Sequence, residues 1–410
     1  MIDQIEHGWH RTFAALKYRN YRLWFWGQML SISGSWMQIT AQGFFVYELT
    51  QSPAYLGYVS FVAGIPTWLF MLYAGVISDR VSRRTLLIIT QSCMMMLAFA
   101  LAVLTFSGLV KPWHIMVMAF LSGMANTFEA PSRLAFVLEM VDREDLTNAI
   151  ALNATMFNTA MALGPALSGV VYAMFGPAWC FTINGISFIA VIIALLLMKL
   201  KANSVRAERN STVDDLKEGF HYVISHTLIR TMIIMGGIAS LFGISFATLL
   251  PAWAVTVLGG DARTNGLLQS ARGIGALIGA LVIASLGRFK FKGKLLTAGT
   301  ITFPAMLIIF TLIRWTPLSL LILILVGTSS IFVMNMANAL IQTLAEDKLR
   351  GRVMSFYSLI FFGTMPIGSL WVGAAAEYTS EASAIAINAA ISLCAAVAIW
   401  FFVPELRALE

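Results

Sequence analysis

The stretch Tyr73-Ala-Gly-Val-Ile-Ser-Asp-Arg-Val-Ser-Arg-Arg-Thr-Leu-Leu87 is a short, densely charged turn between two long apolar segments. Only 11% of the 410 residues are charged, so one acid and three bases packed so closely are unusual in this chain. Gly75 permits a close helix approach. Asp79 can either cap the N–H groups of the helix that follows or attract the positive end of a neighbouring helix. Arg80, Arg83 and Arg84 mark this side of a membrane as cytoplasmic. On composition alone, the stretch also fits an ordinary positively charged turn between two membrane helices.

The composition of the whole chain indicates a membrane protein. Hydrophobic residues make up 59% of the sequence and the mean hydropathy is +0.80, which excludes an ordinary soluble protein. The net charge of +7 is carried by short turns between apolar runs, which argues against nucleic acid as a partner. Residues 1–21 are polar and basic and predict no removable signal peptide. Cys93, Cys180 and Cys394 lie far apart, so we expect neither a disulfide framework nor a metal site.

Twelve apolar stretches are long enough to cross a bilayer as helices, which takes about 20 residues each. We place them at 22–48, 54–77, 85–109, 113–139, 147–175, 178–199, 229–257, 265–287, 295–313, 318–344, 353–377 and 383–403. Lysines and arginines then gather in the turns on one side, and only Lys111, Arg263 and Arg314 fall on the other. The positive-inside rule therefore predicts a multi-pass protein of the cell membrane with both termini in the cytoplasm.

The longest non-apolar interruption predicts a division into two halves. We expect a six-helix bundle over 1–200, a cytoplasmic linker over 201–228 and a second six-helix bundle over 229–410. In the linker, Thr212 can cap an amphipathic surface helix. The halves are weak copies of each other, since Met365-Pro366 corresponds to Gly164-Pro165 and the turn at 287–294 corresponds to the opening turn without its Asp. We therefore predict an all-α membrane protein of two pseudo-symmetric bundles with a substrate site near the midplane.

Polar side chains recur at helical spacing in four predicted spans, so each set lies along one face of its helix. The sets are Gln28, Ser31, Ser35, Gln38 and Gln42; Ser122, Asn126, Glu129 and Arg133; Asn265, Gln269 and Arg272; and Asn335, Asn338 and Gln342. The seventh span has a thinner set interleaved with Phe242 and Phe246. Hydrogen bonds between helices would explain any single residue, at about 1 kcal/mol each. A shared water-filled cavity explains the four sets together and predicts an amphipathic organic substrate.

Three charged residues of these sets carry specific hypotheses. Glu129 is the one carboxylate that we place well inside the hydrocarbon, with Arg133 one helical turn further on. The pair is either the proton-coupling site or a fixed ion pair that holds its helix. Arg272 is a single base in the outer half of its span, and it either contacts an anionic substrate or bonds to Gln269 and backbone carbonyls.

Two motifs resemble those of the major facilitator superfamily. Residues 75–84 are similar to its loop signature Gly-x-x-x-Asp-Arg-x-Gly-Arg-Arg/Lys, with Ser82 in place of the second Gly. Residues 160–169 resemble its antiporter motif Gly-x-x-x-Gly-Pro-x-x-Gly-Gly, in which Gly164, Pro165 and Gly169 match while Ala160 and Ser168 depart. The segments at 22–28 and 126–133 are most similar to the branch of macrolide-efflux and enterobactin-exporter proteins. This branch implies proton-driven export of hydrophobic or amphipathic molecules. The superfamily also implies a conformational latch, in which Glu139 is expected to pair with the arginines of the charged turn (Arg80, Arg83 and Arg84). Asp79 is expected to cap the helix that begins at Arg350-Gly-Arg352.

The predicted function is thus a secondary transporter that works by alternating access. It would export a hydrophobic or amphipathic molecule, such as a drug, siderophore or similar metabolite, in exchange for protons. A lipid or lysolipid transporter, an importer or uniporter, and a membrane receptor without transport are the alternatives. We expect no enzyme, because the sequence has no nucleophile–base pair, metal cluster or phosphate-binding loop. We expect no cofactor, since the proton gradient would supply the energy. The expected partners are a small-molecule substrate and the lipid bilayer, with the chain acting as a monomer.

Overall fold

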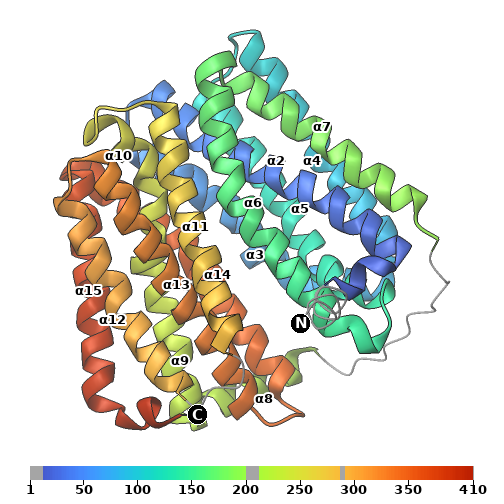
Figure 1. The fold of residues 1–410 in the computed structure, drawn as a ribbon, viewed down its shortest axis with the longest axis vertical. Helices are drawn as coiled ribbons and strands as arrows, with labels where there is room; N and C mark the ends of the chain where they lie inside the picture. Colours follow the sequence, from blue (N-terminus) through green and yellow to red (C-terminus); the bar gives the residue numbers. More distant parts are fainter. Residues whose placement is uncertain (1–12, 200–211, 287–290, 410) are drawn as a thin grey trace, which may run out of the picture. The chain divides into compact units, whose positions relative to one another are not determined.

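The computed structural model describes residues 13–199, 212–286 and 291–409, and within these ranges the chain is helical without any β-strand (Figure 1). The first long helices are α2 (Arg19–Thr50), α3 (Pro53–Arg80), α4 (Arg83–Phe106), α5 (Pro112–Phe136), α6 (Leu146–Phe175) and α7 (Pro177–Leu197). After the linker come α8 (Thr212–Ser225), α9 (Thr227–Ile238), α10 (Leu250–Thr256), α11 (Ala262–Leu286), α12 (Lys292–Leu312), α13 (Thr316–Leu344), α14 (Arg350–Tyr378) and α15 (Glu381–Phe402). The predicted all-α class is confirmed.

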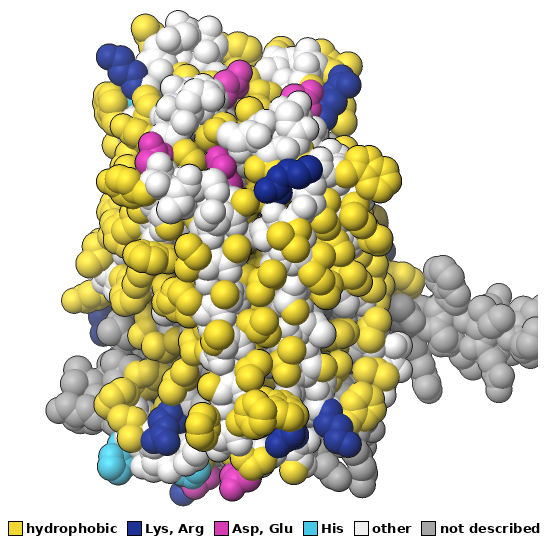
Figure 2. Space-filling view, turned by 90° about the vertical axis from the view of Figure 1, so that its left-hand side faces the viewer, with side chains coloured by type: hydrophobic (Ala, Val, Ile, Leu, Met, Phe, Trp, Pro, Cys, Tyr) yellow, Lys and Arg dark blue, Asp and Glu magenta, His cyan; other side chains and the backbone are white. Residues whose placement is uncertain are grey.

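Ten helical segments among the described residues are long and apolar enough to cross a membrane. Helices α2 and α5 occupy two of the twelve predicted spans but are not among the ten. Both carry polar side chains at helical spacing, which lower their hydropathy. The count of twelve crossings therefore stays a prediction. On the face in Figure 2, hydrophobic side chains cover the middle while charged side chains gather toward the two ends, as a surface in contact with a bilayer requires.

The span predicted as one helix over 229–257 is interrupted. It runs through α9, the π-helical segment η4 (Ala239–Gly243), the 3₁₀ segment η5 (Ile244–Leu249) and α10. Pro251 has no N–H group for the carbonyl of Ala247, so the α-helical hydrogen-bond ladder cannot continue there. Gln269 of α11 donates its side-chain N–H to this carbonyl at 3.4 Å. A side chain from a neighbouring helix thus satisfies the carbonyl that the proline leaves free.

Contacts divide the described chain into two compact units. Unit 1 contains residues 13–42 and 65–199, and unit 2 contains residues 43–64, 212–286 and 291–409. Helices α2 and α3 therefore each contribute one part to unit 1 and the other part to unit 2. The predicted division at 1–200, 201–228 and 229–410 stays a prediction, and the contact-based units differ from it because residues 43–64 join unit 2.

Aromatic side chains fill the core of unit 1 near the beginning of α2. The Trp24 and Phe136 rings meet edge to face with centroids 5.3 Å apart, and both side chains are fully buried. Gly164 of α6 faces α2 so closely that a Cβ atom there would lie 2.8 Å from Ser33 O and 3.1 Å from Met37 N. The small residue of the motif at 160–169 is therefore required by the close packing of two helices.

The core of unit 2 is built around stacked aromatic rings and one very close pair of helices. Trp253 stacks on Phe310 with centroids 4.6 Å apart, and Phe246 packs on the same cluster. Helices α11 and α13 approach through Gly275 and Gly327, whose missing side chains let backbone meet backbone. Thr328 Oγ1 donates a hydrogen bond to Gly275 O at 2.9 Å across this contact. These interactions fix the position of α11, which carries Gln269 and Arg272.

The amphipathic helix predicted in the linker is found as α8. Its Tyr222 and Val223 side chains are buried in a hydrophobic cluster of unit 2, and Phe220 packs against Phe356 of α14 with ring centroids 6.0 Å apart. Glu218 forms an ion pair with Arg352 at the beginning of α14. The predicted apolar positions 213 and 216 have side chains that lie outside the described part of the structure.

Candidate functional site

A buried cluster of polar side chains lies inside unit 1. We call it the acid–amide cluster and define it as Gln28 and Ser31 of α2, Gln91 of α4, and Glu129 and Arg133 of α5. Ser31 Oγ donates to Gln91 Oε1 at 3.3 Å, and the Gln91 amide faces the Glu129 carboxylate. Arg133 Nη1 lies 3.5 Å from Glu129 Oε1. The sequence predicted every member except Gln91, which lies on a helix without a polar stripe.

Several buried polar atoms of the acid–amide cluster have no hydrogen-bond partner among the described residues. Glu129 is only 2% exposed, and its Oε2 atom has no hydrogen-bond partner among the described residues. Gln28 is fully buried, and within the described chain neither its side-chain oxygen nor its side-chain nitrogen has a partner. Buried polar atoms are normally paired, so an unpaired acid oxygen and amide in the same unit indicate a site that can change its hydrogen bonds.

The other predicted cavity residues of unit 1 differ in their surroundings: some form hydrogen bonds within or between helices, and one is exposed. Asn184 of α7 donates to Gln38 Oε1 at 2.7 Å, which is the interhelical hydrogen bond offered as the alternative to a cavity. Ser35 bonds within its own helix to Ser31 O at 2.9 Å. Asn126 is exposed and donates back to Ser122 O at 3.2 Å. The remaining member of the α2 set, Gln42, is half-buried.

The charged turn between α3 and α4 is held by contacts that the sequence predicted only in part. Arg83 Nη1 pairs with Glu139 Oε1 at 2.7 Å, and Arg83 is one of the three arginines expected as partners of Glu139; Arg80 is exposed. Arg84 Nη2 donates to Leu196 O at 2.8 Å. The side chain of Asp79 lies outside the described part, and the backbone of this residue is still within α3.

The capping residue of α4 corrects the prediction for Asp79. Ser82 is the N-cap, and its Oγ accepts from Thr85 N at 3.2 Å. Asp79 cannot take this position because α3 continues as far as Arg80. Ser82 stands where the resembled loop signature has Gly. A serine shortly before a predicted helix is a typical N-cap, and this signal could have revealed the role of Ser82. Gly75 has open space around its Cα, so no close helix approach depends on it.

The motif at 160–169 is an interior packing surface. Gly164, Pro165 and Gly169 are all buried within α6, as is Ser168 at one of the positions that depart from the antiporter motif. Gly164 meets the backbone of α2 as described above. The motif therefore places α6 against the helix that carries Gln28 and Ser31 of the acid–amide cluster.

In unit 2, polar contacts surround the interrupted segment between α9 and α10. Ser240 Oγ donates to Phe361 O at 2.5 Å, and Thr248 Oγ1 donates to Ser369 Oγ at 2.9 Å. Phe242 is half-buried. Phe246 is only 1% exposed and packs against Phe310, so the prediction that it lines a cavity is corrected: it is a core residue of unit 2. The irregular backbone thus sits beside Gln269 of α11.

The predicted polar residues of α13 lie toward the end of that helix. Asn335 is exposed, and Gln342 Nε2 donates to Asn338 Oδ1 at 2.6 Å within the same helix. Arg272 of α11 is half-buried, and its Nε atom is buried without a hydrogen-bond partner among the described residues. The predicted bond from Arg272 to Gln269 is not present; the Gln269 side chain donates instead to Ala247 O.

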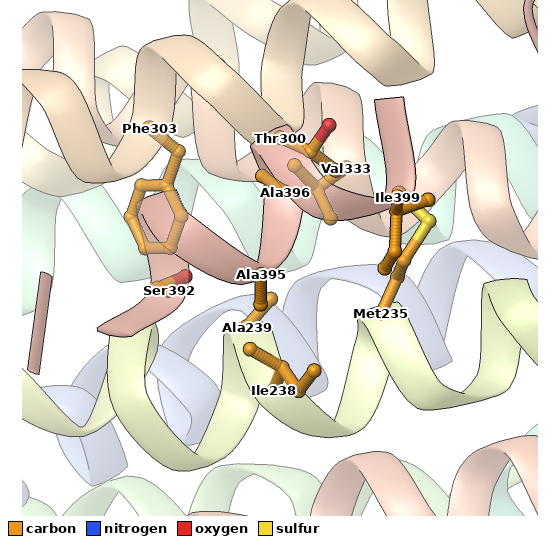
Figure 3. Close-up of a pocket in the computed structure, with 10 residues that line it drawn as sticks. All are labelled: Met235, Ile238, Ala239, Thr300, Phe303, Val333, Ser392, Ala395, Ala396 and Ile399. Carbon is orange, nitrogen blue, oxygen red and sulfur yellow. The ribbon is translucent and has the colours of Figure 1, made fainter. Parts of the chain in front are cut away.

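A pocket of unit 2 lies apart from these polar groups (Figure 3). Its lining is apolar except for Thr300 and Ser392, and it comprises Met235, Ile238, Ala239, Thr300, Phe303, Val333, Ser392, Ala395, Ala396 and Ile399. Its interior of about 20 Å³ holds no more than one water molecule. The pocket is therefore a packing defect beside the π-helical segment η4, too small for an organic substrate.

Residues 43–64 make a close contact with α14 inside unit 2 that sequence reasoning missed. The Glu377 carboxylate accepts from Ser52 Oγ at 2.6 Å and from Ala54 N at 3.2 Å. A Cβ atom at Gly57 would lie 2.7 Å from Ser369 O, so α3 and α14 touch through their backbones. Ser52 and Glu377 lie far apart in the sequence, so no local sequence pattern indicates that they are in contact.

A chain of long apolar helices with polar and charged side chains inside its spans has the architecture of a membrane transporter. Residues 10–410 match the family of major facilitator (MFS) proteins described as transmembrane secretion effector. The chain belongs to this family of secondary transporters, and it is not an enzyme. The resemblance stated from the motifs at 75–84 and 160–169 is confirmed.

Curated relatives agree with the branch that the sequence indicated. The chain is 24% identical to the staphyloferrin A transporter of Staphylococcus aureus, over 94% of this chain and 97% of that protein. It is 20% identical to macrolide efflux protein A of Streptococcus pyogenes, over 96% of this chain and 99% of that protein. It is 25% identical to the enterobactin exporter EntS of Citrobacter koseri, over 76% of this chain and 74% of that protein.

The fold is also that of solved transporter structures. An auto-inhibited peptide transporter of the POT family superposes with a TM-score of 0.74 at 14% identity, covering 96% of this chain and 98% of that chain. The D-xylose–proton symporter gives a TM-score of 0.71 at 14% identity, covering 97% and 98%. At these identities the likeness supports the major facilitator fold alone.

Proposed function

We propose that this protein exports a hydrophobic or amphipathic organic molecule, such as a drug or siderophore, in exchange for protons. It would work by alternating access as a monomer in the cell membrane, with both termini in the cytoplasm and without a cofactor. The direction of transport is supported by relatives whose names specify macrolide efflux and enterobactin export. The resemblance of residues 160–169 to an antiporter motif supports the same direction.

One observation carries the proton coupling: Glu129 is buried in a membrane helix with an oxygen that lacks a partner in the described chain. A carboxylate in this position is costly in its charged form and needs a cation or a proton. Arg133 approaches only to 3.5 Å, at the limit of a hydrogen bond. Glu129 can therefore exchange between pairing with Arg133 and carrying a proton, as an antiporter requires. A fixed ion pair is the competing role.

The test of the export function begins with growth. A host that lacks its own exporters is challenged with a panel of toxic compounds, with and without expression of the protein. Resistance to a compound identifies it as cargo, and flux into everted vesicles under an imposed proton gradient then measures coupling. Export in the same vesicles with no gradient dependence would identify a uniporter, and movement in the opposite direction would identify an importer. Lipid movement alone would identify a lipid transporter.

The role of Glu129 is tested with a variant that keeps its shape. Glu129→Gln is expected to lose gradient-driven flux while substrate exchange between the two sides continues, because exchange needs no net proton movement. Glu144→Gln, which alters an exposed acid of the same unit, is the matched control and should retain driven flux. If driven flux persists in Glu129→Gln, the residue is structural.

We further propose that the charged turn at 75–84 acts with Glu139 as a conformational latch. The Arg83–Glu139 pair supports this proposal, since it joins the turn to the end of α5 in a half-buried setting. Asp79 and Arg80 belong to the same latch in the resembled superfamily. Cysteine labelling from the cytoplasmic side should increase in Asp79→Asn, and unchanged labelling would argue against a latch.

A further inference from the structure

Arg272 is a half-buried cation of unit 2 that has no counterion among the described residues. Helices α9 to α13 contain no Asp or Glu at all. The Arg272 side chain forms no hydrogen bond or ion pair with the described residues, and its Nε atom is buried. A membrane helix normally pairs a charged side chain or turns it toward a water-filled space. An unpaired guanidinium in this position costs free energy, and a bound anion would remove that cost.

The orientation of α11 directs Arg272 away from lipid. Leu267, Ile274 and Ile278 are exposed apolar residues that share one side of this helix. At 3.6 residues per turn, Arg272 and Gln269 fall on the opposite side. The guanidinium is thus presented to the protein side of the helix, where it is half-buried and still accessible.

The surroundings of Arg272 are fixed by contacts described above. Gln269, three residues earlier, donates its side-chain amide N–H to Ala247 O of the interrupted segment, and no hydrogen bond joins it to the guanidinium. On the other side, the backbone of Arg272 packs against Gly327 of α13. The helix cannot rotate or shift without losing both contacts. The backbone at Arg272 is consequently held in place, while its side chain forms no hydrogen bond with the described residues and is available to a ligand.

We propose that Arg272 binds an anionic group of the transported molecule and that the substrates are amphipathic carboxylates. A guanidinium offers N–H donors in a planar fork that matches the two oxygens of a carboxylate. Apolar side chains dominate the surrounding helices, so the rest of such a molecule would be hydrophobic. This inference rests on the proposed transport function and names the chemical class of its cargo.

The test measures binding with a matched pair of fluorescent probes, dansylglycine and its neutral amide, in phosphatidylcholine nanodiscs. The wild-type protein is expected to bind the carboxylate at least about tenfold more tightly than the amide, as a charge-assisted hydrogen bond supplies. Arg272→Gln should bind both probes equally, and Arg272→Lys should keep part of the preference because it retains charge but loses the fork. Arg263→Gln, at the exposed beginning of the same helix, should keep all of it.

Several results would overturn the proposal. Equal binding of both probes by the wild-type protein would do so, as would an undiminished preference in a folded Arg272→Gln protein. A preference that disappears when phosphatidylglycerol is added to the nanodiscs would assign Arg272 to a lipid headgroup instead. The binding assay is independent of transport direction and proton coupling. Failure of the export assay with the anion preference intact would therefore count against the proposed function and leave the Arg272 site standing.

Discussion

Ser52 donates its hydroxyl hydrogen to Glu377 at 2.6 Å, which joins the beginning of α3 to the end of α14. The same carboxylate oxygen accepts from Ala54 N at 3.2 Å, in the first turn of α3. Glu377 therefore caps a helix to which it is not connected locally. A carboxylate at a helix N-terminus is favourable because the free N–H groups there carry partial positive charge.

Glu377→Gln should loosen the first turn of α3. An amide replaces the charged acceptor, so we expect a loss of about 1 kcal/mol and roughly fivefold faster hydrogen exchange at residues 54–57. Hydrogen-exchange mass spectrometry in nanodiscs measures this directly. Glu405→Gln, which alters an exposed acid of the same unit, should leave these amides unchanged. Equal exchange in both variants would mean that the cap contributes nothing.

Gly164→Ala should destabilise the protein, whereas Gly75→Ala should be tolerated. The new Cβ at position 164 would meet Ser33 O at 2.8 Å, so α2 and α6 must separate, at a cost of about 1–3 kcal/mol. No atom lies within 4 Å of a Cβ at position 75. The melting temperature in detergent compares the two. A larger loss at position 75 would contradict the helix contact described for α6.

The Arg83–Glu139 pair should show a measurable coupling energy. Both side chains are mostly shielded, with 18% and 20% of their surface exposed, so solvent weakens the pair less than at an open surface. A double-mutant cycle with Arg83→Gln and Glu139→Gln should give about 1 kcal/mol of coupling in chemical denaturation. Arg80→Gln combined with Glu139→Gln is the matched control and should give none. Coupling of Glu139 to Arg80 in place of Arg83 would contradict the ion pair seen in the structure.

The segment η1 (Ala14–Lys17) should detach at alkaline pH. Lys17 Nζ lies 2.6 Å from Asp145, and this hydrogen bond raises the pKa of Lys17 above its ordinary value of 10.5. Tyr18 bonds the same acid at 2.8 Å, and its own pKa is raised by burial and by Asp145. Because the folded pKa of Lys17 is raised, its contribution is complete below 10.5 and is lost as the pH rises through the folded value.

A spin label at Phe13→Cys would follow this change. Its mobility should be constant between about pH 6 and 9 and should increase only when the pH rises past 10.5 and through the raised pKa of Lys17. Lys17→Met should be mobile across the whole range. A label that becomes mobile in mild alkali, well below 10.5, would show that another group controls the attachment of η1.

Local sequence patterns predicted those parts of the site that depend on spacing along one helix. Glu129 and Arg133 are four residues apart and pair as this spacing predicts. The position of the turn before Arg83 also followed from charge and hydropathy. The break between α9 and α10 was missed, although Pro251 was a visible signal for it.

The remaining misses involve partners that only tertiary structure brings together. Gln91 joins Ser31, and Asn184 joins Gln38, from helices that carry no polar stripe. Their neighbouring polar residues do not repeat at helical spacing along these helices, so nothing in the sequence indicated which helix each amide would contact. Phe246 was assigned to a cavity because aromatic residues at helical spacing fit either a lining or a core, and its contact with Phe310 decides for the core.

The passage of α2 and α3 through both units has a mechanical consequence. Neither helix ends at the boundary, so both helices run without a break from one unit into the other. In α3 the boundary falls between Gly64 and Ile65, directly before Pro66, which withholds a hydrogen bond from the helix at that level. In α2 it falls at Gly43. Bending of α3 therefore costs least at the level of Pro66, next to the place where this helix passes from one unit to the other.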